Sequence, residues 1–174
     1  RVGGAPSETE IDLDENEVVT ILPESVDLLN AIKVSGRTKD NLGVGFFNVI
    51  TEKTTASVKN EETGSIRNVL VEPLTNYSIL VLDQQFNNNS SISLVNTNVT
   101  REGQFRDANV TALVFDLTDK ENAFKASGRA IVSNVDLDTG IRTGLLSELE
   151  LARIKGRFRY RVEHKFANTT YDIN

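Results

Sequence analysis

The sequence predicts an all-β fold, an antiparallel up-and-down β-meander, from three observations. Apolar and polar residues alternate with a period of two in one segment after another, which is typical of strands with one apolar face. Clusters of Asn, Asp and Gly separate these segments and favour hairpin turns. The segments are about 8 to 12 residues long, above the usual five or six residues of strands in soluble sheets.

The chain opens on a stretch without this alternation. Residues 3–7 read Gly-Gly-Ala-Pro-Ser, and residues 8–17 are acidic. We therefore interpret residues 1–25 as an irregular acidic lead-in and residues 26–174 as the β segment.

Six stretches then carry the strand patterns. One face is mainly apolar over residues 32–37, 42–51 and 124–133, whereas residues 77–82 are apolar on both faces and residues 90–100 are mixed. The clearest alternation predicts a strand from Ile154, whose apolar face holds Ile154, Gly156, Phe158, Tyr160 and Val162 and whose other face holds Lys155, Arg157, Arg159, Arg161 and Glu163.

The turn signals divide the chain at regular intervals. Their Asn, Asp and Gly residues tolerate the left-handed backbone that tight hairpins require. Six such clusters occur, at residues 38–41, 60–64, 87–89, 101–103, 119–122 and 136–140.

Long antiparallel strands with one apolar and one charged face fit two environments. In a soluble sandwich or barrel the apolar face forms the core, and in an outer-membrane barrel it contacts lipid. Glycines within the predicted strands, such as Gly43 and Gly128, favour a barrel wall. The absence of Trp and the presence of only three Tyr argue against the aromatic girdles of membrane barrels. The pattern alone leaves both environments open.

The most distinctive charged feature is a basic stripe of Lys155, Arg157, Arg159 and Arg161. It could face a ligand such as an anionic sugar, or it could line a barrel lumen. We favour pairing with acidic residues on the preceding strand, such as Glu148 and Glu150, because opposite charges on neighbouring strands stabilise a sheet.

The sequence contains no recognisable catalytic, cofactor or metal constellation. It has no Cys, which excludes disulfides and thiolate metal sites, and His164 is its only His. No Gly-x-Ser-x-Gly elbow accompanies that histidine, and a carboxylate pair such as Asp83 and Asp116 cannot be placed at a catalytic separation from sequence. The net charge of -6 argues against nucleic acid as a partner. Six Asn-x-Ser/Thr sequons occur, and we interpret them as chance occurrences in an Asn-rich β-protein.

Three stretches resemble a family of Gram-negative, Bacteroidota-type envelope proteins. Residues 1–7 resemble the Arg-Ile-Gly-x-x-Pro segment that opens the C-terminal region of that family. Residues 31–39, followed by residues 42–51, are similar to its Lys-Leu-Thr-Gly-Lys-Thr-Lys strand and the strand after it. Residues 71–77 read Val-Glu-Pro-Leu-Thr-Asn-Tyr, which matches the most specific signature of the family.

The resemblance implies a fold and a context. Members pair an N-terminal carbohydrate-binding module resembling family nine with a C-terminal domain of unknown function that forms an outer-membrane-type β-barrel. Residues 26–174 would then be a segment of that barrel, and the chain an internal piece of a longer protein. The absence of Met agrees with an internal piece. The resemblance supplies no catalytic residue.

We therefore expect a non-enzymatic segment of a β-barrel in the outer membrane of a Gram-negative bacterium, linked to glycan handling or transport. Its expected partners are outer-membrane lipid, carbohydrate, and other envelope proteins or the rest of a longer chain, with no cofactor. Two alternatives remain. One is a soluble β-sandwich that binds carbohydrate beside a glycoside hydrolase, in the periplasm or at the cell surface, and the other is a structural subunit of an envelope or secretion complex.

Overall fold

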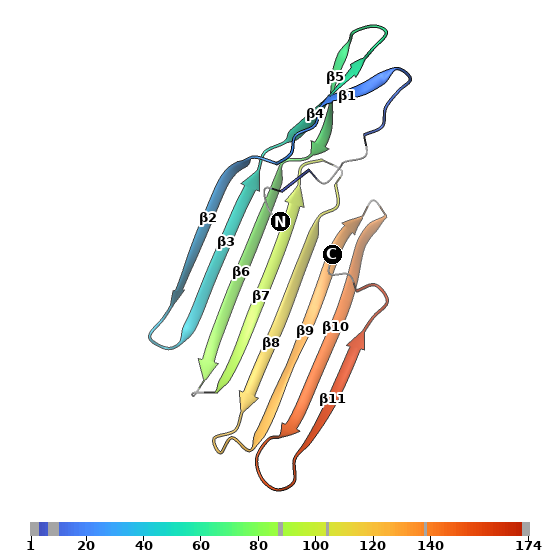
Figure 1. The fold of residues 1–174 in the computed structure, drawn as a ribbon. Helices are drawn as coiled ribbons and strands as arrows, with labels where there is room; N and C mark the ends of the chain where they lie inside the picture. The colour runs from blue at the N-terminus through green and yellow to red at the C-terminus, as the bar shows by residue number, and fades with distance from the viewer. Residues whose placement is uncertain (1–3, 7–10, 87–88, 104, 138, 172–174) are drawn as a thin grey trace.

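The computed structural model describes residues 4–6, 11–86, 89–103, 105–137 and 139–171 (Figure 1). These residues form eleven strands in two antiparallel sheets, and the predicted all-β class is confirmed. The part of the chain that is described contains no helix long and apolar enough to cross a membrane.

The large sheet is a single layer of eight strands that lie side by side (Figure 1). Its order is β11-β10-β9-β8-β7-β6-β3-β2, and all neighbours are antiparallel. Within the described residues the sheet is open, with β2 and β11 as its edges. The strands are β2 (Leu28–Arg37), β3 (Leu42–Thr51), β6 (Thr75–Phe86), β7 (Ser90–Arg101), β8 (Ala108–Thr118), β9 (Phe124–Leu137), β10 (Gly140–Arg153) and β11 (Tyr160–Ala167).

The meander is interrupted once, by a hairpin that leaves the large sheet. After β3 the chain forms β4 (Thr54–Asn60) and β5 (Ile66–Glu72), and then returns so that β6 pairs with β3. β4 also pairs with β1 (Glu17–Ile21), which completes a three-stranded sheet beyond one end of the large sheet (Figure 1). The interpretation of residues 1–25 as irregular is therefore wrong for the five residues of β1.

The described residues of the predicted turns lie between consecutive strands or at strand ends. Asn41 and Asn122 adopt positive φ angles of 62° and 53° in the β2–β3 and β8–β9 turns. Gly64, Gly103 and Gly140 do the same in three other connections. Residues 87, 88 and 138 of the predicted clusters lie outside the described residues.

The predicted strand from Ile154 is wrong over its first six residues. Residues 154–159 form the loop between β10 and β11, and the strand begins at Tyr160. Gly156 has a φ of 103° in this loop, and the Ile154 amide donates to the Ala123 carbonyl at 2.8 Å. The loop is thereby attached to the neighbouring β8–β9 turn.

Burial concentrates where the two sheets meet. The Val-Glu-Pro-Leu-Thr-Asn-Tyr signature joins the end of β5 to the start of β6, and Val71, Pro73 and Thr75 within it are fully buried. The Thr75 hydroxyl donates to the Pro73 carbonyl at 3.0 Å, which stabilises this bend. The signature therefore occupies the packed junction. Other buried apolar side chains at this end of the molecule are Val26, Val49, Ala56 and Val58.

An ion pair joins β1 to β5 across the small sheet. Arg67 Nε and Nη2 donate to Glu17 Oε1 and Oε2 at 2.8 and 2.6 Å, and the Asp14 amide donates to Glu17 Oε2 at 2.9 Å. The Arg67 hydrogen bond, followed by that amide, lowers the pKa of Glu17 to about 2. The pair therefore stays ionised down to strongly acidic pH.

We predict that Glu17→Gln weakens the small sheet at neutral pH and has a much smaller effect at pH 2. Because the pKa of Glu17 is lowered to about 2 on folding, its stabilising effect is complete above the ordinary glutamate pKa and is lost progressively as pH falls through the folded-state pKa. Hydrogen-exchange protection of the β1 amides, measured from pH 2 to 7, should show the two proteins converging at the acidic end. Glu15→Gln, in the same exposed turn, is the control and should leave protection unchanged; a pH-independent difference for Glu17→Gln would contradict the prediction.

Candidate functional site

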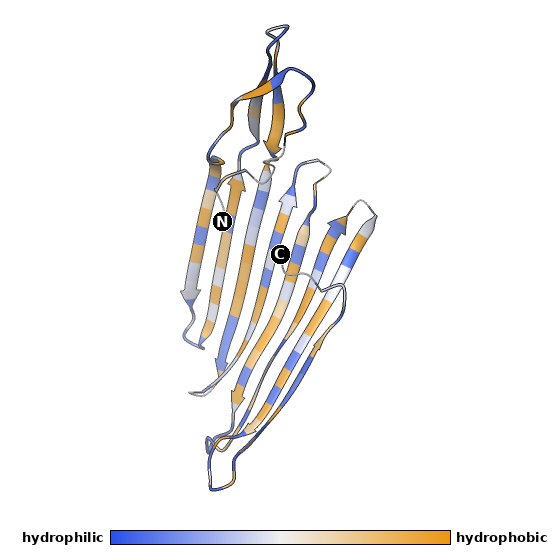
Figure 2. Ribbon diagram, turned by 45° about the vertical axis from the view of Figure 1, so that its right-hand side comes forward, coloured by the Kyte–Doolittle hydropathy of each residue, from blue (hydrophilic) through white to orange (hydrophobic). Residues whose placement is uncertain are grey.

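The strand register sorts the side chains of the large sheet onto two faces. Residues directly opposite one another point to the same side, and alternate residues along a strand point to opposite sides. Val44, Leu82, Leu94 and Leu113 form one such cross-strand row. We call the side that carries this row the apolar face and the opposite side the charged face. Figure 2 shows the resulting alternation of hydropathy along the strands.

The apolar face carries large exposed hydrophobic side chains on all eight strands. No described segment covers them, although such side chains are exposed by more than a third of their surface. Val34 and Val162, on the two edge strands, are 61% and 60% exposed. Members between the edges include Val44, Phe46, Leu80, Leu94, Leu113, Leu117, Val132, Leu145, Leu149 and Leu151.

A ladder of amide and hydroxyl groups borders this apolar region at the end nearer the small sheet. Asn48 Nδ2 donates to Asn76 Oδ1 at 2.6 Å, and Asn109 Nδ2 donates to Asn98 Oδ1 at 3.1 Å. The ladder also includes Asn96 with Thr111 and Thr143 with Asn134, both at 2.8 Å. Three of the six sequons begin at Asn76, Asn98 and Asn109, so these asparagines lie in hydrogen-bonded strand positions and not in loops.

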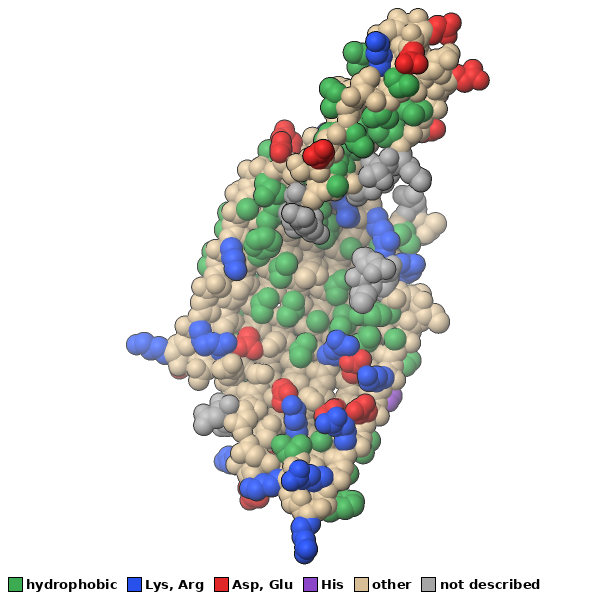
Figure 3. Space-filling model, in the orientation of Figure 1, with side chains coloured by type: hydrophobic (Ala, Val, Ile, Leu, Met, Phe, Trp, Pro, Cys, Tyr) green, Lys and Arg blue, Asp and Glu red, His purple; other side chains and the backbone are tan. Residues whose placement is uncertain are grey.

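The charged face holds a series of ion pairs over the half of the sheet farther from the small sheet (Figure 3). Lys125 Nζ lies 2.6 Å from Asp116 Oδ2, and Arg129 Nε lies 2.6 Å from Glu148 Oε2. Lys165 approaches the other oxygen of Glu148 at 4.0 Å. Each pair links neighbouring strands, so the charges compensate one another across the sheet.

One ion pair crosses an intervening strand. Arg37 on β2 reaches over β3 to Asp83 on β6, with Nη2 2.7 Å from Oδ2, and the Ser93 hydroxyl on β7 donates to Asp83 Oδ1 at 2.7 Å. Gly43 of β3 lies directly between Arg37 and Asp83 in the register. A Cβ there would lie 3.1 Å from Arg37 Nη2, so glycine leaves the space through which the arginine passes.

The basic residues singled out from the sequence do not form one stripe. Lys155, Arg157 and Arg159 lie in the β10–β11 loop, and only Arg161 lies in a strand. Arg161 Nε is 3.5 Å from Glu150 Oε1, which confirms the expected pairing with an acid of the preceding strand. Arg161 thus belongs to the charged face and the other three residues to its loop end.

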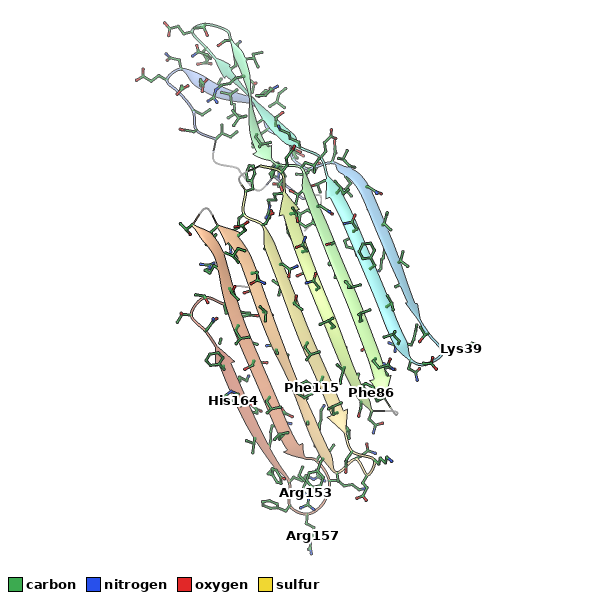
Figure 4. The ribbon with its side chains drawn as sticks, turned by 180° about the vertical axis from the view of Figure 1, so that it is seen from behind. Lys39, Phe86, Phe115, Arg153, Arg157 and His164 are labelled. Atoms are coloured by element: carbon green, nitrogen blue, oxygen red, sulfur yellow. The ribbon has the colours of Figure 1, made fainter. Side chains whose placement is uncertain are left out.

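The remaining predicted candidates show no catalytic arrangement. His164 pairs with Leu149 in the register and lies on the apolar face (Figure 4). Asp83 and Asp116 share the charged face, but they are held by Arg37 and Lys125 respectively. Among the described residues no group of three His, Asp or Glu side chains is placed to hold a metal ion.

Sequence reasoning named Glu148 and Glu150 as acidic partners but missed the pairing of Asp83 and Asp116 with basic residues. Both aspartates occupy positions in the alternation of their strands, which was the available signal. The long-range partner of each, such as Arg37 for Asp83, depends on strand order and could not be read from local pattern.

We predict that a side chain at position 43 uncouples Arg37 from Asp83. In the native chain a double-mutant cycle with Arg37→Gln and Asp83→Asn should give a coupling of about 0.2–1 kcal/mol, as for other partly exposed pairs. In a Gly43→Val background the coupling should fall to near zero. Gly45→Val is the control, since a Cβ there meets only Val81 Cβ at an ordinary 3.6 Å; equal coupling in both backgrounds would refute the role of Gly43.

Comparison with known proteins identifies a family and no individual relative. Neither the curated proteins nor the solved structures contain a match to this chain. A family model, described as a domain of unknown function, matches residues 1–174. The chain therefore belongs to the family Domain of unknown function (DUF5916).

Proposed function

We propose that this chain forms part of the wall of an outer-membrane-type β-barrel, with the apolar face toward lipid and the charged face toward the aqueous interior. The observation that carries the proposal is the uncovered apolar face, which extends over all eight strands. Soluble monomers rarely expose contiguous apolar patches larger than a few hundred Å². A lipid environment would remove the unfavourable free energy of exposing this apolar face to water.

The dimensions of the strands support the same proposal. A strand needs about 9–11 residues to cross a bilayer at the usual tilt. β2 and β3 have 10 residues, β6 and β7 have 12, and β9 and β10 have 14. Every strand is antiparallel to its neighbours, as in bacterial outer-membrane barrels.

The borders of the apolar face have the character of membrane interfaces. The amide ladder lies toward the small sheet. Toward the opposite end lie exposed aromatic rings, which are Phe86, Phe124, Phe158 and Tyr160. Aromatic side chains are enriched where a membrane protein passes from hydrocarbon to water, so these rings take the place of the missing tryptophans.

A soluble sandwich would require a second layer over the apolar face. The small sheet lies beyond one end of the large sheet and not over it (Figure 1), so the described residues supply no such layer. The barrel is therefore the better proposal. Among the described residues no strand pairs with the outer edges of β2 and β11, so further strands could add there, either from other envelope proteins or from the rest of a longer chain.

The proposed role is non-enzymatic. We place the chain in the outer membrane of a Gram-negative bacterium, where it would serve glycan handling or transport with carbohydrate as a partner. The sequence resemblance supports this role, and the pairing of the acidic residues of the charged face with basic residues agrees with a wall and not with a catalytic centre. Arg161, with its Glu150 partner, would line the interior.

Two adjacent phenylalanines allow a direct test of which face meets lipid. The chain has no Trp, so Phe46→Trp and Phe47→Trp each introduce a single fluorophore, on the apolar and charged faces of β3 respectively. In proteoliposomes with brominated acyl chains we expect strong quenching of the tryptophan at position 46 and little at position 47. Water-soluble acrylamide should show the reverse order; equal response of the two positions to brominated lipid would contradict the proposal.

A charge on the apolar face gives a second test. Leu113→Arg should lower the unfolding free energy in lipid by about 2–4 kcal/mol if the site lies near the bilayer midplane. An exposed leucine in a water-soluble protein would tolerate the same change within about 0.5 kcal/mol. Leu113→Ala separates loss of the side chain from introduction of charge, and urea unfolding in liposomes measures all three proteins.

A further inference from the structure

Two adjoining hollows lie where the apolar face ends at the β8–β9 turn and the β10–β11 loop. The first has a volume of about 460 Å³ and is lined on its apolar side by Leu117, Phe124, Leu151 and Tyr160. The second, of about 380 Å³, shares Tyr160 with the first and is lined by Arg153, Arg159 and Arg161. An apolar cavity and a basic cavity therefore meet at one aromatic ring.

Two of the three arginines that line the second hollow, Arg153 and Arg159, lack acidic partners among the described residues, whereas Arg161 pairs with Glu150. Arg153 lies over the Phe124 ring, with its Cζ 5.7 Å from the ring centroid, and its Nε is buried without a hydrogen-bond partner in the described part of the chain. Arg159 Nε donates to the nearby Gly156 carbonyl at 3.3 Å. Arg157 lies at the tip of the loop (Figure 4). The ion pairs of the charged face reach this end at Lys125 and Arg161 but leave Arg153 and Arg159 without an acidic partner in the described part of the chain.

The local charge is strongly positive. Residues 153–159 contain four basic residues and no acidic one. Asp119 lines the first hollow, but its carboxylate accepts hydrogen bonds from the Ala123 and Phe124 amides at 2.6 and 2.9 Å. These backbone hydrogen bonds lower the pKa of Asp119, so it remains an anion engaged with the turn. Lys125, at the same hollow, is paired with Asp116.

We propose that the two hollows together hold one phospholipid with an anionic headgroup. The phosphate would contact Arg153 and Arg159, and the first part of an acyl chain would lie against Leu117, Phe124, Leu151 and Tyr160. Guanidinium groups bind phosphate through charge-assisted hydrogen bonds, and the apolar hollow beside them favours a lipid over a free anion. The uncompensated positive charge favours an anionic over a zwitterionic headgroup.

This inference rests on the proposed function, because it takes lipid to cover the apolar face. It adds a preference for one lipid class at one place. Phe158 is 69% exposed, and its ring centroid is 5.9 Å from that of Tyr160, so Phe158→Trp reports on the hollows. Phe46→Trp reports on the apolar face at a distant strand.

The test uses the full chain in liposomes of phosphatidylglycerol and phosphatidylcholine, with bromine on one lipid or the other. At position 158, half-maximal quenching should require a lower mole fraction of brominated phosphatidylglycerol than of brominated phosphatidylcholine. The difference should be about fivefold for each arginine that contacts the headgroup. At position 46 the two lipids should quench equally. Arg153→Gln and Arg159→Gln should each reduce the preference at position 158, and Arg153→Lys should retain part of it. Lys39→Gln, which removes a positive charge from the β2–β3 turn, should leave it unchanged.

The outcomes separate the two proposals. Equal quenching by both lipids at position 158, with quenching at position 46 intact, would overturn the lipid site and leave the barrel proposal standing. No quenching at either position would overturn both. Loss of the preference when inorganic phosphate replaces chloride at equal ionic strength would identify a site for a free anion and would also overturn the lipid site.

Discussion

The structure depends on one constraint, which is that the large sheet is a single layer. Backbone hydrogen bonds hold neighbouring strands together, but no second layer in the described residues removes the apolar face from water. The packed apolar interior is concentrated at the junction with the small sheet, around Val49, Val58 and Val71. A sheet of this kind reaches its full stability only when its surroundings supply an apolar contact. Both faces, and the proposals built on them, follow from that requirement.

The charged face shows how the sheet tolerates many ionisable groups without a buried charge. Its acids and bases are matched across neighbouring strands, and the pairs keep partial contact with solvent. The Arg37–Asp83 pair shows that this matching extends beyond nearest neighbours where glycine gives space. At the β10–β11 loop, by contrast, Arg153 and Arg159 have no acidic partner among the described residues. That contrast distinguishes a structural network from a surface suited to a ligand.

The sequence predicted what depends on near neighbours along the chain. The alternation at residues 42–51 and the turns at Asn41 and Asn122 involve adjacent residues, and both match the structure. The β4–β5 excursion was missed, because the pairing of Thr51 with Thr75 is decided by burial at the junction and not by local pattern. Residues 154–159 were wrongly predicted as strand because a loop with alternating basic and apolar residues has the same period as a strand. The basic residues of the candidate site were visible in the sequence. The sequence did not show that Arg161 lies in a strand, where it forms an ion pair, and that the other three lie in a loop, because that depends on the register of β10 and β11.

The pairing of Thr51 with Thr75 has an evolutionary implication. These two residues face each other at the ends of β3 and β6, so a tight turn in place of residues 52–74 would leave every ladder of the large sheet intact. The β4–β5 hairpin therefore occupies an insertion point at which a chain can gain, lengthen or exchange a projecting module without altering the register of the wall. Diversification among proteins built on this sheet is expected to concentrate there.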